Sequence, residues 1–85
     1  MNAQEAISQL SNALAIVNQE SFDKETIRTL TKFVDDKHKQ YIERGLMLND
    51  RHLIMHGIVG ALSHYEAEKD KEKFEKKISS IAQDS

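Results

Sequence analysis

The chain has 85 residues, no cysteine, no proline, three glycines and a formal net charge of −2. This length predicts a single helical domain, residues 1–85, with a core that is marginal without help from a partner chain. The lack of cysteine excludes disulfides and thiolate zinc sites and fits a reducing cytoplasm. Because no stretch approaches the roughly 18 apolar residues of a membrane span and no secretion signal is present, we expect a cytoplasmic protein without membrane association.

Charged side chains of both signs are interleaved along the chain. Residues 21–45 carry six basic and five acidic side chains, and residues 67–85 carry five of each. Nucleic-acid binding normally needs a positive stripe, because neutralising phosphates supplies most of the affinity. The sequence has no such stripe, so DNA is a possible partner but not the favoured one.

The first expected helix covers about residues 3–17. Its large apolar residues recur at steps of three and four, which places them on one face: Ile7, Leu10, Leu14 and Val17. The polar segment "NQES" then interrupts the pattern.

The second expected helix runs from a cap at Asp23 to a stop at Gly45. Asp23 can accept hydrogen bonds from the free amides of the first turn, and glycine is the usual residue where a helix ends in a left-handed conformation. The apolar stripe of this helix contains Ile27, Leu30, Val34, His38, Tyr41 and Ile42. His38 is expected to be a half-buried, hydrogen-bonded side chain on this stripe.

A third helix is expected to begin after Asn49, which would cap it, with Leu48 packing on Leu53. A turn this tight predicts that the second and third helices pack antiparallel. The third helix is apolar on nearly every side. One broad face holds Ile54, Ile58, Ala61, Leu62 and Tyr65, and a different side holds Leu53, Gly57 and Gly60.

A helix that is apolar most of the way round is normally buried most of the way round. A single short chain should have too few helices to cover both sides, so we expect a second copy to cover one of them. The expected self-association face contains Leu53, Gly57, Gly60 and His64, with the glycines allowing close approach. After this helix, the charge-rich segment from residue 66 onward is expected to break or bend near residues 66–70 and to form a fourth helix, although a continuous helix is the alternative.

The sequence contains no recognisable group of catalytic residues. His52 and His56 are four residues apart, a spacing that can bind a metal, but no third ligand is evident. Asp35 and Asp36 are adjacent and so point about 100° apart on a helix, which makes them a poor carboxylate pair. We expect no enzyme, no cofactor and no metal.

The joint "GLMLNDRHL" resembles the corresponding joint of the small biofilm-development proteins of the AriR/YmgB type, and the likeness covers about residues 22–81. The matching positions are Gly45, Leu48, Asn49, Arg51 and Leu53, followed by Ile54, Ile58 and Leu62. The resemblance implies an all-helical dimer without catalysis that regulates biofilm formation and acid or stress responses by contacting signalling proteins of a phosphorelay, with DNA association also possible. The chain departs from the pattern in two ways. Its third expected helix carries Gly57, Gly60 and three histidines, and its C-terminal segment is more charged.

Taken together, these patterns predict an all-α fold, a small antiparallel helical hairpin or bundle of three to four helices that forms a homodimer. The expected function is regulation through protein–protein contact, with Arg51 and mixed-charge helix faces contacting a signalling or regulatory protein. Two alternatives remain open: a small dimeric DNA-binding transcriptional regulator, and a monomeric helical bundle like the bacteriocin-immunity proteins.

Overall fold

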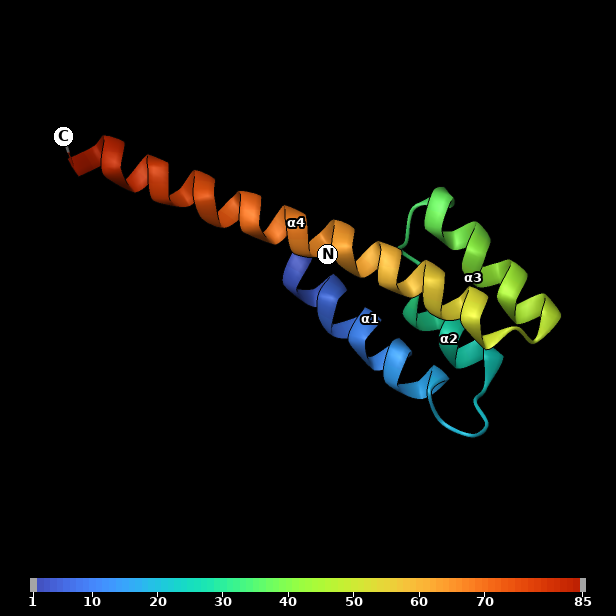
Figure 1. Cartoon of the computed structure of the whole chain (residues 1–85). Coiled ribbons are helices and arrows are strands. Elements are labelled where there is room, and N and C mark those ends of the chain that lie inside the picture. The colour runs from blue at the N-terminus through green and yellow to red at the C-terminus, as the bar shows by residue number, and fades with distance from the viewer. Residues whose placement is uncertain (1, 85) are drawn as a thin grey trace.

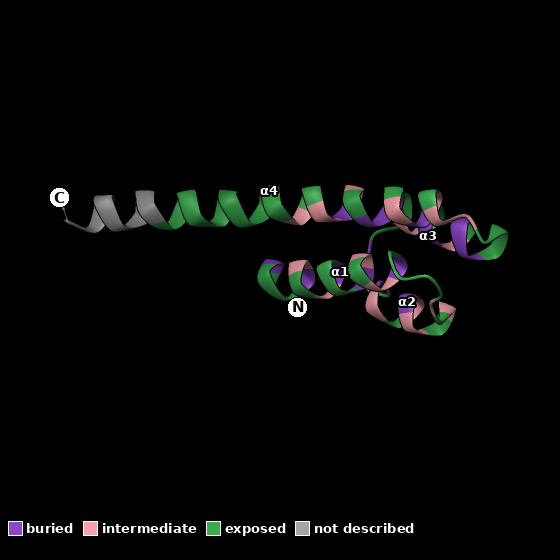
Figure 2. Ribbon diagram, turned by 60° about the horizontal axis from the view of Figure 1, so that its bottom comes forward, coloured by how far each residue is buried: buried purple, intermediate pink, exposed green. Residues whose placement is uncertain are grey.

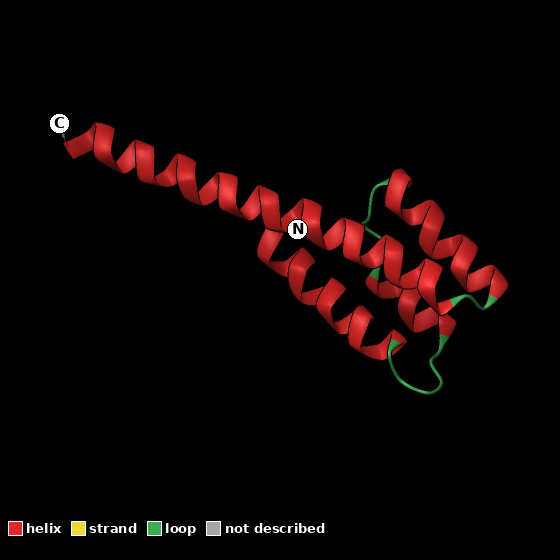
Figure 3. Cartoon of the chain, viewed as in Figure 1, coloured by secondary structure: helices red, strands yellow, loops and turns green. Residues whose placement is uncertain are grey.

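A computed structural model describes the backbone of residues 2–84 and the side chains of residues 2–76. The described part contains helices and loops and no strand: α1 (Ala3–Val17), α2 (Lys24–Leu30), α3 (Asp36–Leu48) and α4 (Arg51–Asp84). Short loops join the helices (Figure 3). The expected all-α class and the small antiparallel bundle are confirmed. The way the chain is divided into helices differs from the prediction at two places.

Helix α1 has the predicted bounds, but its buried face is built mostly on small residues. The buried positions recur at alternating steps of three and four: Ala3, Ala6, Leu10, Ala13 and Val17. Ile7 and Leu14, which were expected on this face, are half-buried at its edges. Alanines at the centre of the face leave room for α1 to lie close to its neighbour α4, with the larger side chains packing at the sides.

The single second helix expected between Asp23 and Gly45 is wrong, because the chain breaks it into α2 and α3. Thr31 is buried, and its hydroxyl donates a 2.8 Å hydrogen bond to the carbonyl of Ile27. Such back-bonding competes with regular helical hydrogen bonds and favours a bend. Asp35 then caps a new helix in an extended backbone conformation. The break lets α2 pack on α1 while α3 packs on α4.

The joint between α3 and α4 also assigns its residues differently from the prediction. Asn49, not Gly45, adopts the left-handed conformation after α3, with φ of 54°. The amide of Asp50 donates to the carbonyl of Gly45 at 2.8 Å, the bond that closes a Schellman-type helix end. Asp50, not Asn49, caps α4, since its carboxylate accepts from the amides of His52 at 3.1 Å and Leu53 at 3.3 Å.

Gly45 serves close packing in place of the expected stop. A Cβ atom on Gly45 would lie 2.6 Å from Cγ1 of Ile54 and 2.7 Å from its backbone nitrogen. Only glycine therefore allows α3 and α4 to touch so near their joint. Leu48, which was expected to pack on Leu53, is 58% exposed.

The first half of α4 is the centre of the molecule. It runs between α1 and α3, as Figure 1 shows in yellow and orange, and both helices pack on it. Ile54, Ile58 and Ala61 are almost wholly buried there, and Figure 2 shows this half largely in purple and pink. The expectation that one chain has too few helices to cover α4 on two sides is therefore wrong: α1 covers one side and α3 another.

The second half of α4 continues straight out of the bundle, so the expected break near residues 66–70 is wrong. No glycine or proline follows Gly60, and Glu–Lys pairs three and four residues apart support a solvated helix. We call residues 66–84 the arm. Its residues 66–76 are all exposed, and the arm gives the molecule its elongated extents of 56 × 21 × 18 Å.

Candidate functional site

The two glycines predicted at a self-association face lie against α3 of the same chain. A Cβ atom on Gly57 would meet Cγ1 of Ile42 at 2.7 Å and the carbonyl oxygen of His38 at 2.8 Å. A Cβ atom on Gly60 would meet Cδ2 of His38 at 2.7 Å. The close approach expected of these glycines is thus made within one chain, and they supply no reason for a second copy on this side.

The other two residues of the expected face do not join into one patch. Leu53 is half-buried and His64 is exposed. The Nε2 atom of His64 lies 3.6 Å from a carboxylate oxygen of Glu68, and its ring stands edge-on to Tyr65 with centroids 5.2 Å apart. Of the four predicted residues, His64 has the accessibility that an interface residue needs.

Arg51, the residue expected to contact a partner, is bound to its own chain. Its guanidinium donates to the carbonyl of Gln19 at 2.7 Å and to that of Glu20 at 3.2 Å. It also lies over the ring of Phe22, 5.9 Å from the centroid. These contacts tie the start of α4 to the loop between α1 and α2, which is a structural task and leaves little of the side chain for a partner.

His38 is half-buried and hydrogen-bonded, as expected from its place on the stripe. Its Nδ1 atom lies 2.7 Å from Oδ1 of Asp35. Asp35 is the cap residue of α3, but its side chain pairs with the imidazole and accepts no hydrogen bond from the first amides of the helix. The hydrogen bond from His38 is the main cause that lowers the pKa of Asp35 below its ordinary value of 3.8, and His64 adds a smaller effect. This pair stabilises the start of α3 beside α4.

The exposed large apolar side chains described in the globular part lie on α3 and α4: Tyr41, Met47, Leu48 and Val59. We call Tyr41, Met47, His56 and Val59 the α3–α4 surface. Met47 is 77% exposed, Val59 47% and Tyr41 41%. The Tyr41 ring stands edge-on to the imidazole of His56, with centroids 4.8 Å apart, and His56 and Val59 are neighbours at a three-residue step on one helix side.

A shallow hollow with a volume of about 560 Å³ adjoins this surface. Its lining side chains come from successive turns of α3: Lys37, Gln40, Tyr41, Glu43, Arg44 and Met47. Glu43 accepts a 3.3 Å hydrogen bond from Arg28, which offsets its charge. Lys37 and Arg44 therefore give the rim of the hollow a basic character.

The sequence pattern did not reveal this surface, because it put Tyr41 on the buried stripe. Ile42 and Leu46, four residues apart, are the fully buried large side chains of α3. Tyr41 precedes Ile42 by one residue, which turns it about 100° away from the core. Since α2 ends at Leu30 and α3 starts at Asp36, Tyr41 does not continue the helical phase of Ile27 and Leu30.

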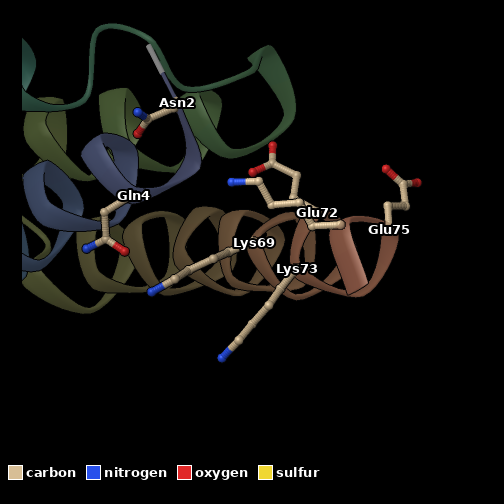
Figure 4. A pocket seen from close by; sticks show the side chains of 7 residues that line it. Asn2, Gln4, Lys69, Glu72, Lys73 and Glu75 are labelled. Atoms are coloured by element: carbon tan, nitrogen blue, oxygen red, sulfur yellow. The ribbon is translucent and has the colours of Figure 1, made fainter. Parts of the chain in front are cut away.

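A second hollow, of about 710 Å³, lies between the start of α1 and the base of the arm (Figure 4). All of its lining residues are polar or charged in type: Asn2, Gln4, Lys69, Glu72, Lys73, Glu75 and Lys76. Figure 4 shows Lys69 and Lys73 pointing away from Glu72 and Glu75. Because charges of both signs line it without converging, this hollow defines no ligand position.

Metal-ligating residues do not cluster in residues 2–76: no three of the histidine and carboxylate side chains there are close enough to hold an ion. His52 and His56 are both exposed on α4, without a third ligand from that part of the chain. The helices, as far as they are described, include none with the length and apolar character needed to cross a membrane. Comparisons with family models, with curated proteins and with solved structures find no match to this chain.

Proposed function

We propose that this protein is a cytoplasmic regulator without catalytic activity, which acts by binding another protein through the α3–α4 surface. The observation that carries the proposal is the group of exposed tyrosine, methionine and histidine side chains held on two packed helices. The resemblance of the joint "GLMLNDRHL" to the AriR/YmgB-type proteins adds the kind of partner, a signalling protein of a phosphorelay, and the kind of process, biofilm formation or a stress response.

The composition of the surface supports protein binding. Tyrosine, methionine and arginine are enriched in protein interfaces, and tyrosine and arginine often carry a large share of the binding free energy. Tyr41 and Met47 lie on α3, which is anchored by the buried Ile42 and Leu46. Side chains on an anchored helix lose little backbone freedom when a partner binds, which favours affinity.

The charges beside the surface define the partner's chemistry. Lys37 and Arg44 are exposed next to Tyr41 and Met47, whereas the nearby Glu43 is engaged with Arg28. A matching partner surface would have an apolar centre and acidic residues at its rim. Such complementarity raises the association rate and disfavours partners with basic surfaces.

Site-specific photo-crosslinking in the source cells tests this proposal. A photoreactive amino acid at position 47 should form an adduct with a phosphorelay signalling protein, and the same group at the exposed position 12 on α1 should not. The identified partner, once purified, should bind the wild-type chain directly. Adducts at both positions alike, or none at position 47, would refute the proposed site.

Matched double variants then measure the contribution of the surface. Tyr41→Ala with Met47→Ala should weaken binding of the purified partner at least tenfold, because each removes an exposed interface side chain. Ser8→Ala with Asn12→Ala, also exposed, should leave binding unchanged. Tight binding of duplex DNA that falls steeply with salt would favour the DNA-binding alternative instead.

A further inference from the structure

Four exposed side chains form a straight stripe along α3. They recur at steps of four, three and four residues, which places them on one side of the helix: Lys37, Tyr41, Arg44 and Leu48. Four exposed side chains of α4 repeat the same spacing: His52, His56, Val59 and Ser63. Each stripe covers about three helical turns, a length of about 16 Å.

The two stripes lie side by side over this length. The antiparallel helices touch at three glycines, where an added Cβ atom would come within 2.7 Å of the facing helix: Gly45, Gly57 and Gly60. Between the stripes, the rings of Tyr41 and His56 stand edge-on with centroids 4.8 Å apart, and Figure 1 shows α3 alongside the first half of α4. The stripes therefore form one elongated face on two helices that are packed against each other.

A face built from two helices suits a third helix better than an extended strand. The backbone groups within α3 and α4 are hydrogen-bonded along their own helices, so the face has no edge to which a strand could add hydrogen bonds. A partner helix satisfies its own backbone and can pack at about 8–10 Å from the neighbouring helix axes. Its apolar side would contact Tyr41, Leu48 and Val59.

The charge of the face selects an acidic helix. Lys37 and Arg44 give the two stripes a charge of +2, on a chain whose formal net charge is −2. The stripes contain two histidines in addition and no carboxylate. Two such cations beside exposed tyrosine, leucine and valine are few for duplex DNA, whose binding rests on contacts with many phosphates. They match a protein helix that carries carboxylates beside an apolar stripe.

The carboxylates around the face lie outside the two stripes. Glu43 is paired with Arg28 of α2, and Asp50 accepts from the first amides of α4. Asp36 is turned about 100° from the first residue of the α3 stripe, and Glu66 follows the last residue of the α4 stripe by three positions. Acidic side chains of a partner would therefore meet the cations of the face with no carboxylate between them.

We propose that the two stripes bind one amphipathic helix of a partner protein, packed lengthwise along α3 and α4, with carboxylates flanking its apolar side. This inference rests on the proposed function, since it takes the α3–α4 surface as the binding site and names the element that the site binds. The partner helix would complete a layer on the side of α3 and α4 that their own chain leaves exposed.

Three synthetic peptides test the chemistry of the occupant by nuclear magnetic resonance of the isotope-labelled chain. The first is an alanine-based helix of about four turns, with leucines at steps of four, three and four residues and glutamates on both sides of them. The second has lysine in place of glutamate, and the third has the composition of the first with its leucines scattered around the helix. The first should shift the amide signals of both stripes, and the other two should bind at least tenfold more weakly.

Other results of this experiment would overturn the inference. Equal affinity for the acidic and basic peptides, shifts confined to the arm, or no binding of the acidic peptide would each do so. Duplex DNA that shifts the same signals more strongly than the acidic peptide would assign the face to nucleic acid. Shifts at both stripes when the chain alone is concentrated would assign it to a second copy.

Matched charge reversals separate the face from the net charge of the chain. Lys37→Glu with Arg44→Glu should weaken binding of the acidic peptide at least tenfold and tighten binding of the basic one, with unchanged helix content because both positions are exposed. Lys69→Glu with Lys73→Glu makes the same change in net charge on the arm and should leave both affinities unchanged. An equal loss in the two double variants would contradict the role of the face.

The partner identified by crosslinking at position 47 distinguishes this inference from the proposed function. Photoreactive groups at positions 37, 44 and 48 should attach to successive turns of one partner helix, with acidic residues beside the points of attachment. Attachment to an extended strand or a loop would refute the helix and leave the proposed function intact. Without any adduct at position 47 the proposed function fails, and the peptide affinities still decide the inference.

Discussion

The imidazole of His38 lies directly over Gly60, so that a Cβ atom on this glycine would come within 2.7 Å of ring carbon Cδ2. The same ring is bonded to Asp35 through Nδ1 at 2.7 Å. The helix that carries His38 therefore rests on the glycine side of α4, and one histidine links the cap of α3 to the central helix. The glycines are sites of contact between helices of one chain.

Gly57→Ala should destabilise the fold by about 1–3 kcal/mol through overpacking. Its Cβ atom would meet the carbonyl oxygen of His38 at 2.8 Å and the backbone nitrogen of Ile42 at 3.1 Å, and backbone cannot move as a side chain can. Urea denaturation should show a lower midpoint for this variant.

Gly60→Ala is the matched comparison, because its new Cβ atom meets only the side chain of His38. A swing of that ring and the higher helix propensity of alanine should leave its midpoint close to that of the wild type. Equal midpoints for the two alanine variants would contradict the packing described for Gly57.

The joint between α3 and α4 makes a separate prediction. Asp50→Ala should cost about 1 kcal/mol, because it removes the acceptor for the first amides of α4. Asn49→Ala should cost about 1–2 kcal/mol, since alanine is strained in the left-handed conformation that Asn49 adopts. Asn49→Gly, which has no such strain, should be milder than Asn49→Ala in thermal or urea unfolding.

The stability contributed by Asp35 should depend on pH. The folded state lowers the pKa of this carboxyl, so its contribution is present above the ordinary value of 3.8 and is lost as the pH falls through the lower folded value. Asp35→Asn should therefore be less stable than the wild type near neutrality and equal to it in strong acid. The difference should be small, about 0.5 kcal/mol, because the Asp35 side chain is 57% exposed. Unfolding curves of both chains across this range would measure it, and a difference that persists in strong acid would speak against the His38 bond.

Two arginines separate stability from partner binding. Arg51→Ala should lower the free energy of unfolding by about 1–2 kcal/mol, because it removes two charge-assisted hydrogen bonds to the loop after α1. Arg44→Ala should change the free energy of unfolding by less than about 0.5 kcal/mol, as is usual for exposed positions. It should nevertheless weaken binding to the proposed partner. The opposite pattern, a stable Arg51→Ala chain that no longer binds, would return Arg51 to the role first expected of it.

Local sequence determined much of the architecture. Apolar residues at steps of three and four predicted α1 correctly, because an amphipathic helix buries only one of its sides in the protein core. The short segment around Asn49 and Asp50 was correctly identified as a tight antiparallel joint. The left-handed end was expected at Gly45 and lies at Asn49, and the cap was expected at Asn49 and lies at Asp50. Asparagine and glycine both favour the left-handed end of a helix, and asparagine and aspartate both cap the start of one.

Tertiary structure decided the rest. The break at Thr31 depends on where Ile27 and the start of α3 can pack, and no local pattern in the sequence records that. Both α1 and α3 are needed to bury α4 on two sides. The apolar residues all round α4 predict that it is buried, but not whether the helices that bury it belong to the same chain or to another. The candidate surface at Tyr41 emerged for the same reason: a helical repeat gives relative angles between side chains, and only the neighbouring helices determine which angle faces the solvent.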